Sequence, residues 1–146
     1  MIDFNTFECV QLEDVAEFGR AKEGHIYPRG SSTIQISATN GQIDYLDFPR
    51  VVETKHVVIV PQAGINTKYF NYVLQKNVDV FVRKFKTGLN IQEHEVGKFP
   101  IELHSSETQK AIAKMLSYVD DEEARRQEEV DALIELKKTL LSQMMI

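Results

Sequence analysis

Several features that would indicate a membrane, secreted or metal-binding protein are missing from the 146-residue sequence. No apolar run approaches the roughly 18 residues that are needed to cross a bilayer. The first ten residues include Asp3 and Glu8 and lack the basic and apolar pattern of a secretion signal. The single cysteine, Cys9, can form neither an internal disulfide nor a multi-cysteine zinc site. We therefore expect a cytoplasmic protein with no membrane segment.

An excess of basic residues is also absent. Lysine and arginine number 17 against 22 aspartates and glutamates, which gives a formal net charge of −5. This balance argues against a strongly basic protein that coats nucleic acid, although a local basic face can still bind it. The composition is 42% hydrophobic and 27% charged, as expected for a globular domain.

The last part of the sequence contains neither glycine nor proline. All seven glycines and all four prolines lie before residue 105. Both residue types mark turns and are excluded from helix interiors, so we expect a turn-rich domain at 1–104 and a helix at 105–146. Ser106, with Gln109 three residues later, matches a capping box at the start of this helix. A continuous helix of this length would reach about 60 Å.

An apolar stripe with spacings of three and four runs along the predicted helix, interrupted by the acidic residues 120–123. Its second part includes Leu133, Leu136, Leu140 and Met144. Exposed leucines need a cover, so we expect a coiled-coil-like arm or a helical hairpin that packs against a partner. A helix folded back on its own domain is the alternative.

The first 104 residues show mainly the pattern of strands. Polar and apolar residues alternate in 32–37 and again in 42–46, and Asn40-Gly41 between them predicts a hairpin. The β-branched run at 56–60 predicts a buried strand.

Further elements are expected between residue 66 and the long helix. Asn66 is placed to cap a short helix at 68–75, and strands are predicted at 78–85 and 99–103. The predicted fold class is α+β, with a mixed, mostly antiparallel sheet domain followed by a long C-terminal coiled-coil-like helix.

Motifs for nucleotide binding and for metal binding are missing. No Gly-x-x-x-x-Gly-Lys-Ser/Thr or Gly-x-Gly-x-x-Gly sequence occurs, and the four histidines are scattered. We therefore expect no cofactor and no metal. Asp44 or Asp47, followed by Glu53 and Lys55, is the best nuclease-like pattern, because such residues can hold Mg²⁺ beside an attacking water. A small metal-dependent nuclease that uses Asp47, Glu53 and Lys55 stays open as an alternative.

Polar and basic residues gather in three groups near predicted turns. Arginine and lysine neutralise phosphates, whereas serine, asparagine and glutamine read base edges. Gly30 and Gly88 lie in the first and third groups and would let a ligand approach the backbone closely. The candidate DNA-contacting residues are Lys22, Tyr27, Arg29, Ser31 and Ser32 in the first group, Asn40 and Gln42 in the second, and Arg83, Lys84, Lys86, Thr87 and Asn90 in the third.

Three stretches resemble the specificity subunit of Type I restriction–modification systems. The first is Gly24–Ser31 (GHIYPRGS), which leads into Gln35–Ile43 (QISATNGQI), similar to the early part of a target recognition domain. The second is Gly88–Gln92 (GLNIQ), similar to a segment near the end of that domain. The third is Glu107–Ala113 (ETQKAIA) together with Leu136–Met145 (LKKTLLSQMM), which resembles the spacer helix of the family.

The resemblance implies a target recognition domain at 1–104 and a helical spacer or dimerisation arm at 105–146. The family chain usually has two of each, so we expect a half-length form whose two copies pair through Leu133, Leu136, Leu140 and Met144. Such a dimer would read a spaced, bipartite site in double-stranded DNA and dock a modification (methyltransferase) subunit. The chain itself would be non-catalytic, and no Asn/Asp-Pro-Pro-Tyr/Phe methyltransferase motif occurs in it. A decoy or adaptor that binds such subunits without reading DNA is the other alternative.

Overall fold

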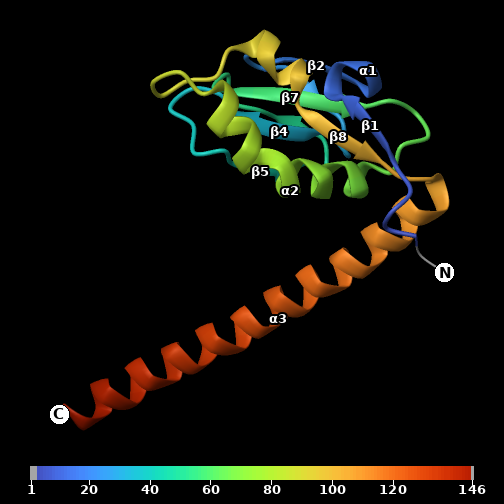
Figure 1. Cartoon of the computed structure of the whole chain (residues 1–146). Coiled ribbons are helices and arrows are strands. Elements are labelled where there is room, and N and C mark those ends of the chain that lie inside the picture. Colours follow the sequence, from blue (N-terminus) through green and yellow to red (C-terminus); the bar gives the residue numbers. More distant parts are fainter. Residues whose placement is uncertain (1–2, 146) are drawn as a thin grey trace. The chain divides into compact units, whose positions relative to one another are not determined.

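An antiparallel four-stranded sheet forms the centre of the first part of the chain in the computed structural model, which describes residues 3–145 (Figure 1). The strands lie in the order β2, β7, β4 and β5, and each neighbouring pair is antiparallel. Their bounds are Ala16–Arg20 for β2, His56–Pro61 for β7, Ser32–Gln35 for β4 and Ile43–Tyr45 for β5. Ser32 is opposite Tyr45 and Ile34 is opposite Ile43, which confirms the hairpin that Asn40-Gly41 predicts.

Smaller elements surround this sheet. Two further antiparallel pairs are formed by β1 (Glu8–Gln11) with β8 (Pro100–Leu103) and by β3 (Ile26–Tyr27) with β6 (Arg50–Val51). The helices are α1 (Leu12–Val15), α2 (Thr67–Phe85), the 3₁₀ helix η1 (Glu93–Lys98) and α3 (Ser106–Met144). The α+β class and the long C-terminal helix are therefore confirmed, and every strand pair among the described residues is antiparallel rather than mixed.

Strand β7 separates two apolar cores because its side chains alternate between the faces of the sheet. Val57 and Ile59 belong to the larger core, which also contains the apolar side of α2. Val58 belongs to a smaller core on the other face, together with Leu46 and Val52. The predicted buried strand is thus the centre of the domain, covered on both sides.

Helix α2 is longer than the sequence pattern predicts. Asn66 caps it as expected, with its side-chain oxygen accepting a hydrogen bond from the Tyr69 backbone N–H at 2.9 Å. The predicted strand at 78–85 is wrong, because the helix continues to Phe85. Val78 and Phe81 are buried three residues apart, which is the spacing of one helix face rather than of a strand.

The cap of α3 lies one residue before the predicted one. The Thr108 backbone N–H donates to Ser105 Oγ at 3.3 Å, so Ser105 and not Ser106 caps the helix. The Gln109 side chain instead accepts a hydrogen bond from the Asn66 backbone N–H at 3.0 Å and donates to the His104 carbonyl at 2.8 Å. The helix is continuous over 39 residues.

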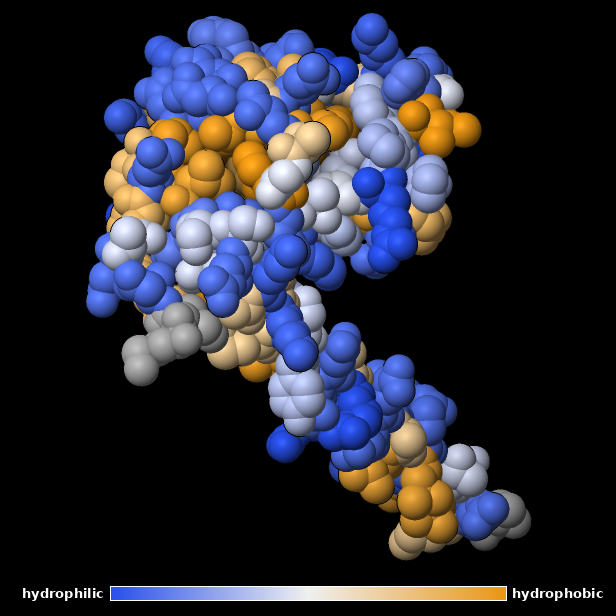
Figure 2. All heavy atoms as spheres, turned by 90° about the vertical axis from the view of Figure 1, so that its right-hand side faces the viewer, coloured by the Kyte–Doolittle hydropathy of each residue, from blue (hydrophilic) through white to orange (hydrophobic). Residues whose placement is uncertain are grey.

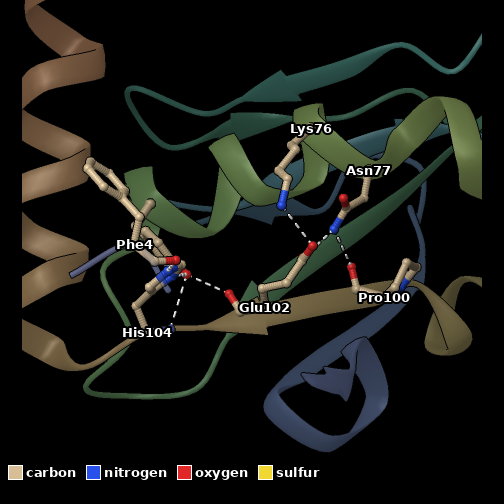
Figure 3. A network of polar contacts seen from close by, with 7 residues as sticks. Phe4, Lys76, Asn77, Pro100, Glu102 and His104 are labelled. Carbon is tan, nitrogen blue, oxygen red and sulfur yellow. Dashed lines mark hydrogen bonds and ion pairs between the residues drawn. The ribbon is translucent and has the colours of Figure 1, made fainter. Parts of the chain in front are cut away.

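A polar network joins β8 to α2 and to the N-terminal segment (Figure 3). Tyr69 Oη lies 2.5 Å from the Glu102 carbonyl oxygen and 2.6 Å from His104 Nδ1, and burial raises the pKa of Tyr69. The Glu102 carboxylate accepts hydrogen bonds from Lys76 Nζ at 2.9 Å and Asn77 Nδ2 at 2.6 Å. Burial alone would raise the pKa of Glu102, but these two bonds, together with the positive charge of Lys76, outweigh it and leave the pKa below the usual 4.5.

The chain divides into two compact units, one up to Ala113 and one from Lys114 onward. All buried side chains among residues 3–145 belong to the first unit, and the second unit is the distal part of α3. Its exposed leucines include Leu133, Leu136 and Leu140. No helix within the described residues is long and apolar enough to cross a membrane.

Candidate nucleic-acid interface

Two turns that are far apart in the sequence are joined at one end of the central sheet. We call residues 38–42 and 86–90 the turn pair; in Figure 1 the turns are drawn in cyan and yellow at the same end of the domain. The Ala38 N–H donates to Asn90 Oδ1 at 2.9 Å, and the Thr39 N–H donates to the Leu89 carbonyl at 2.9 Å. The second and third predicted groups therefore form one surface.

The C-terminal end of α2 packs against the turn pair. Gly41 has a φ of +77°, and a Cβ atom added to it would lie 3.0 Å from Val82 Cγ2. The turn between β4 and β5 is therefore pressed closely against the last turns of α2. This contact brings Asn40 and Gln42 to the helix end that carries Arg83 and Lys84.

The second turn of the pair is a tight reversal. The Thr87 N–H donates to the Asn90 carbonyl at 2.9 Å, and the Asn90 N–H donates to the Thr87 carbonyl at 3.2 Å. Gly88 adopts a φ of +63°, which residues with a side chain rarely adopt. After the turn, the Ile91 N–H donates to the Ile36 carbonyl at 2.9 Å and anchors the segment to the end of β4.

One segment at this end is basic although the whole chain is acidic. The segment 83–92 (RKFKTGLNIQ) contains Arg83, Lys84 and Lys86 and no acidic residue. Arg83 and Lys84 are exposed, and Lys84 Nζ lies 5.5 Å from the centre of the Phe85 ring. Such a segment can neutralise phosphates, while the neighbouring amides of Asn40 and Gln42 present donors and acceptors.

Arg20 belongs to the same end of the sheet and was missed by the sequence analysis. Its side chain donates from Nε to the Thr54 carbonyl at 2.8 Å and from Nη2 to Ser37 Oγ at 3.1 Å. Ser37 directly precedes the first turn of the pair, so the Arg20 guanidinium lies beside it, while the Arg20 backbone N–H donates to Glu93 Oε1 at 3.0 Å. The only sequence signal would have been a strand assignment at 16–20, since Arg20 ends that strand.

The first predicted group is not part of the turn pair. Ser31 and Ser32 are fully buried: Ser31 Oγ donates to the Pro28 carbonyl at 2.8 Å, and Ser32 Oγ accepts from Asn71 Nδ2 at 3.0 Å. Both lie at the opposite end of β4 from the turn pair. Because their hydroxyls are buried and bonded inside the domain, we do not retain these two serines as base contacts.

The rest of the first group is arranged around the β3–β6 ribbon. The Lys22 backbone N–H donates to Tyr27 Oη at 2.9 Å, and the His25 and Tyr27 rings meet edge to face at 4.6 Å. Arg29 is exposed in the loop that follows β3. These residues form a second polar area whose role stays a prediction.

The nuclease alternative gains no support from the geometry. Lys55 Nζ lies 3.4 Å from Glu53 Oε2 in an exposed turn, which is an ordinary surface ion pair. Asp44 and Glu53 border a shallow hollow beside Arg50. Within residues 3–145, no group of three or more histidine, cysteine or acidic side chains is placed to hold a metal ion.

Comparison with known proteins identifies the family. A family model described as the Type I restriction modification DNA specificity domain matches residues 14–136. The chain belongs to this family. The resemblance seen in the sequence is thereby confirmed, and the family is one of specificity domains rather than of catalytic subunits. No curated protein matches the sequence.

Solved structures show that this specificity domain shares its fold with known specificity subunits. The S subunit of the Type-I restriction-modification system from M. genitalium has 17% identity and a TM-score of 0.71 over 94% of this chain and 45% of that one. The HsdS subunit from Thermoanaerobacter tengcongensis has 11% identity and a TM-score of 0.64, with 83% and 39% covered.

A third match comes from a structure that describes the complex assembly and conformational transition of the type I R-M system. It has 14% identity and a TM-score of 0.71, with 90% of this chain and 43% of that chain covered. The specificity domain therefore spans less than half the length of each of these three chains.

Proposed function

We propose that this chain reads the base sequence of double-stranded DNA as the recognition part of a Type I restriction–modification specificity subunit. The turn pair carries this proposal, because it joins a basic segment to exposed amide side chains through hydrogen bonds between the two turns. Lys86 and its basic neighbours would contact phosphates, and Asn40 and Gln42 would contact base edges. Membership in the specificity-domain family supports the same function.

A selection from random duplex DNA tests the proposal, performed with and without a modification subunit. An enriched sequence would support DNA reading and would supply the probe for all later binding measurements. Binding of the modification subunit without any enriched DNA would favour the decoy or adaptor alternative. If neither DNA nor the modification subunit binds, the proposal is wrong.

A matched pair of lysine variants then tests the proposed interface. Lys86→Ala should weaken binding to the selected DNA and lower the slope of log affinity against log salt concentration by about one, as expected for a lost phosphate contact. Lys110→Ala makes the same charge change at an exposed position in the first turns of α3 and should leave the slope unchanged. Equal salt-dependence slopes for both variants would show that Lys86 makes no phosphate contact.

We also propose that residues 105–146 act as a spacer that pairs with a second copy and docks the modification subunit. The support is the exposed apolar series Leu133, Leu136, Leu140 and Met144 along α3. Large exposed apolar faces mark surfaces that another protein covers. A cytoplasmic location, where DNA and the modification subunit would be available, remains an expectation of this proposal.

A further inference from the structure

One face of α3 carries a pattern that is the same when it is read in either direction. The face follows alternating steps of three and four residues, which is the spacing of a coiled-coil seam. Six consecutive members are Leu116, Val119, Glu123, Arg126, Val130 and Leu133, and the same spacing continues to Lys137, Leu140 and Met144. Within these six, apolar residues occupy both ends and charged residues occupy the middle, so this part of the face is symmetric about the point between Ala124 and Arg125.

The middle of this face is open in the structure. A hollow on α3 is bordered by Val119, Glu122, Glu123, Arg126, Gln127 and Val130, and this set is itself symmetric about the same point. Glu122 is satisfied within the helix by Arg125 Nη2, and Gln127 Nε2 donates to Asp131 Oδ1 at 2.9 Å. Within residues 3–145, Glu123 and Arg126 form no ion pair in their own chain.

Antiparallel pairing about this point makes the levels formed by these six residues complementary. Leu116 would lie opposite Leu133 of a second copy, and Val119 opposite Val130. Glu123 would lie opposite Arg126 of the second copy, and the symmetry repeats this ion pair on the other side of the centre. Figure 2 shows apolar side chains gathered on the part of α3 that follows its hydrophilic middle.

Other alignments of the two helices would place Glu123 and Arg126 opposite apolar residues or opposite like charges. A slide of seven residues puts Glu123 opposite Leu133 and Arg126 opposite Val130, and the reverse slide puts them opposite Val119 and Leu116. Each slide buries charges without partners, which costs far more than it gains. Parallel pairing in register would place Glu123 opposite Glu123 and Arg126 opposite Arg126.

We propose that Glu123 and Arg126 form a central charge layer that allows α3 to pair with a second copy in one antiparallel register only. This inference rests on the proposed pairing of two copies and adds which residues select the partner and the alignment. A single polar layer in an apolar seam specifies register at a cost in stability. Of the four apolar residues that support pairing, only Leu133 belongs to these levels, so Leu136, Leu140 and Met144 stay available to the modification subunit.

Exchanging the charges at positions 123 and 126 in the 146-residue chain tests the central charge layer. Glu123→Arg alone places arginine opposite arginine, and Arg126→Glu alone places glutamate opposite glutamate, so light scattering should show each variant with half the mass of the wild-type dimer. A mixture of the two variants restores both ion pairs and should return to dimeric mass. The double variant Glu123→Arg with Arg126→Glu should also be dimeric by itself.

The control variants make charge changes of the same kind at positions outside the proposed pairing face. Glu128→Arg and Lys114→Glu both lie at exposed positions on the opposite side of the helix from Glu123 and Arg126, and both should remain dimeric. None of the substituted side chains belongs to the buried core, and circular dichroism would verify that the helix content is retained.

Distances between spin labels test the alignment independently in a Cys9→Ser background. Antiparallel pairing about residues 124 and 125 separates two labels at position 121 by about 10 Å along the helix axis and two labels at position 138 by about 40 Å. Similar short distances at both positions would show parallel pairing and overturn the inference.

The outcomes separate the two proposals. A wild-type chain that is monomeric in solution overturns both the pairing and the charge layer, whether or not it binds DNA. A wild-type dimer whose single charge variants stay dimeric, or whose mixture fails to recover the dimer, overturns the charge layer and leaves the pairing in place.

Discussion

Gly41 is restricted both by its backbone conformation and by its neighbours. Its φ of +77° is unfavourable for any residue with a side chain, and a Cβ atom would press on Val82. We expect Gly41→Ala to lower the free energy of unfolding by more than the roughly 1–2 kcal/mol that a left-handed conformation alone costs. Urea denaturation of the purified protein measures this loss.

Gly64 provides the control for the cost of the left-handed backbone conformation. Its φ is +94°, but an added Cβ would meet nothing within 4 Å, so Gly64→Ala should show the conformational cost without the clash. An equal loss in both variants would mean that Val82 moves aside freely and that the turn pair is less tightly held than its contacts indicate.

The Glu102 carboxylate gives the domain an acid-sensitive contact. Its hydrogen bonds from Lys76 and Asn77 hold its pKa in the folded state below 4.5, so the unfolded state binds the proton more readily. Stability from this group is present above its unfolded-state pKa and is lost as the pH falls through the lower folded-state value. We expect Glu102→Gln to flatten the fall in unfolding free energy between about pH 5 and pH 3. The same slope as the wild type would contradict this account.

At the scale of single residues, the sequence could predict the chemistry of the site but not which side chains are exposed. Asn40, Gln42 and Lys86 were selected as polar residues near turns, and they lie on one surface because Asn90 and Leu89 bond to the other turn. Ser31 and Ser32 have the same chemistry, yet they are buried by contacts with residues that are distant in the sequence, such as Asn71. Local pattern does not contain that information.

At the scale of elements, local pattern predicted β7 and α3 well and failed on the second half of α2. The β-branched run 56–60 is buried on both faces, so composition alone identified it. The segment 78–85 has valine and phenylalanine at positions that satisfy either alternation or helical spacing. Packing decided the conformation, because Phe81 lies 4.5 Å from the Phe99 ring and 5.0 Å from the Phe85 ring between centres.

Phe81 therefore provides the sharpest test of α2. It is 1% exposed, so Phe81→Ala should remove about 3–5 kcal/mol of unfolding free energy by leaving a cavity. Val80 is the next residue along the helix and is 58% exposed, so Val80→Ala should change stability very little. If thermal unfolding showed similar losses for both, the helical assignment of this segment would be wrong.

At the scale of the whole molecule, we expect the first unit to determine the stability of the fold and the second unit to determine association with a second copy. No described residue beyond Ala113 is buried, so removal of residues 114–146 should leave the unfolding free energy of the domain nearly unchanged. The shortened chain should still bind one half of the selected DNA site but should no longer associate with a second copy. Calorimetry and light scattering measure the two effects separately, and a shortened chain that fails to fold would contradict this independence.

The bonds that join the turn pair also make the proposed recognition surface open to change. The Thr39 N–H donates to the Leu89 carbonyl and the Ile91 N–H donates to the Ile36 carbonyl, and any residue except proline supplies such an N–H group. Asn90, whose Oδ1 accepts from the Ala38 N–H, would be kept. Asn40, Gln42 and Lys86 contribute no side chain to the core, so a library randomised at these three positions should consist mostly of folded proteins. New DNA preferences could then be selected without rebuilding the domain.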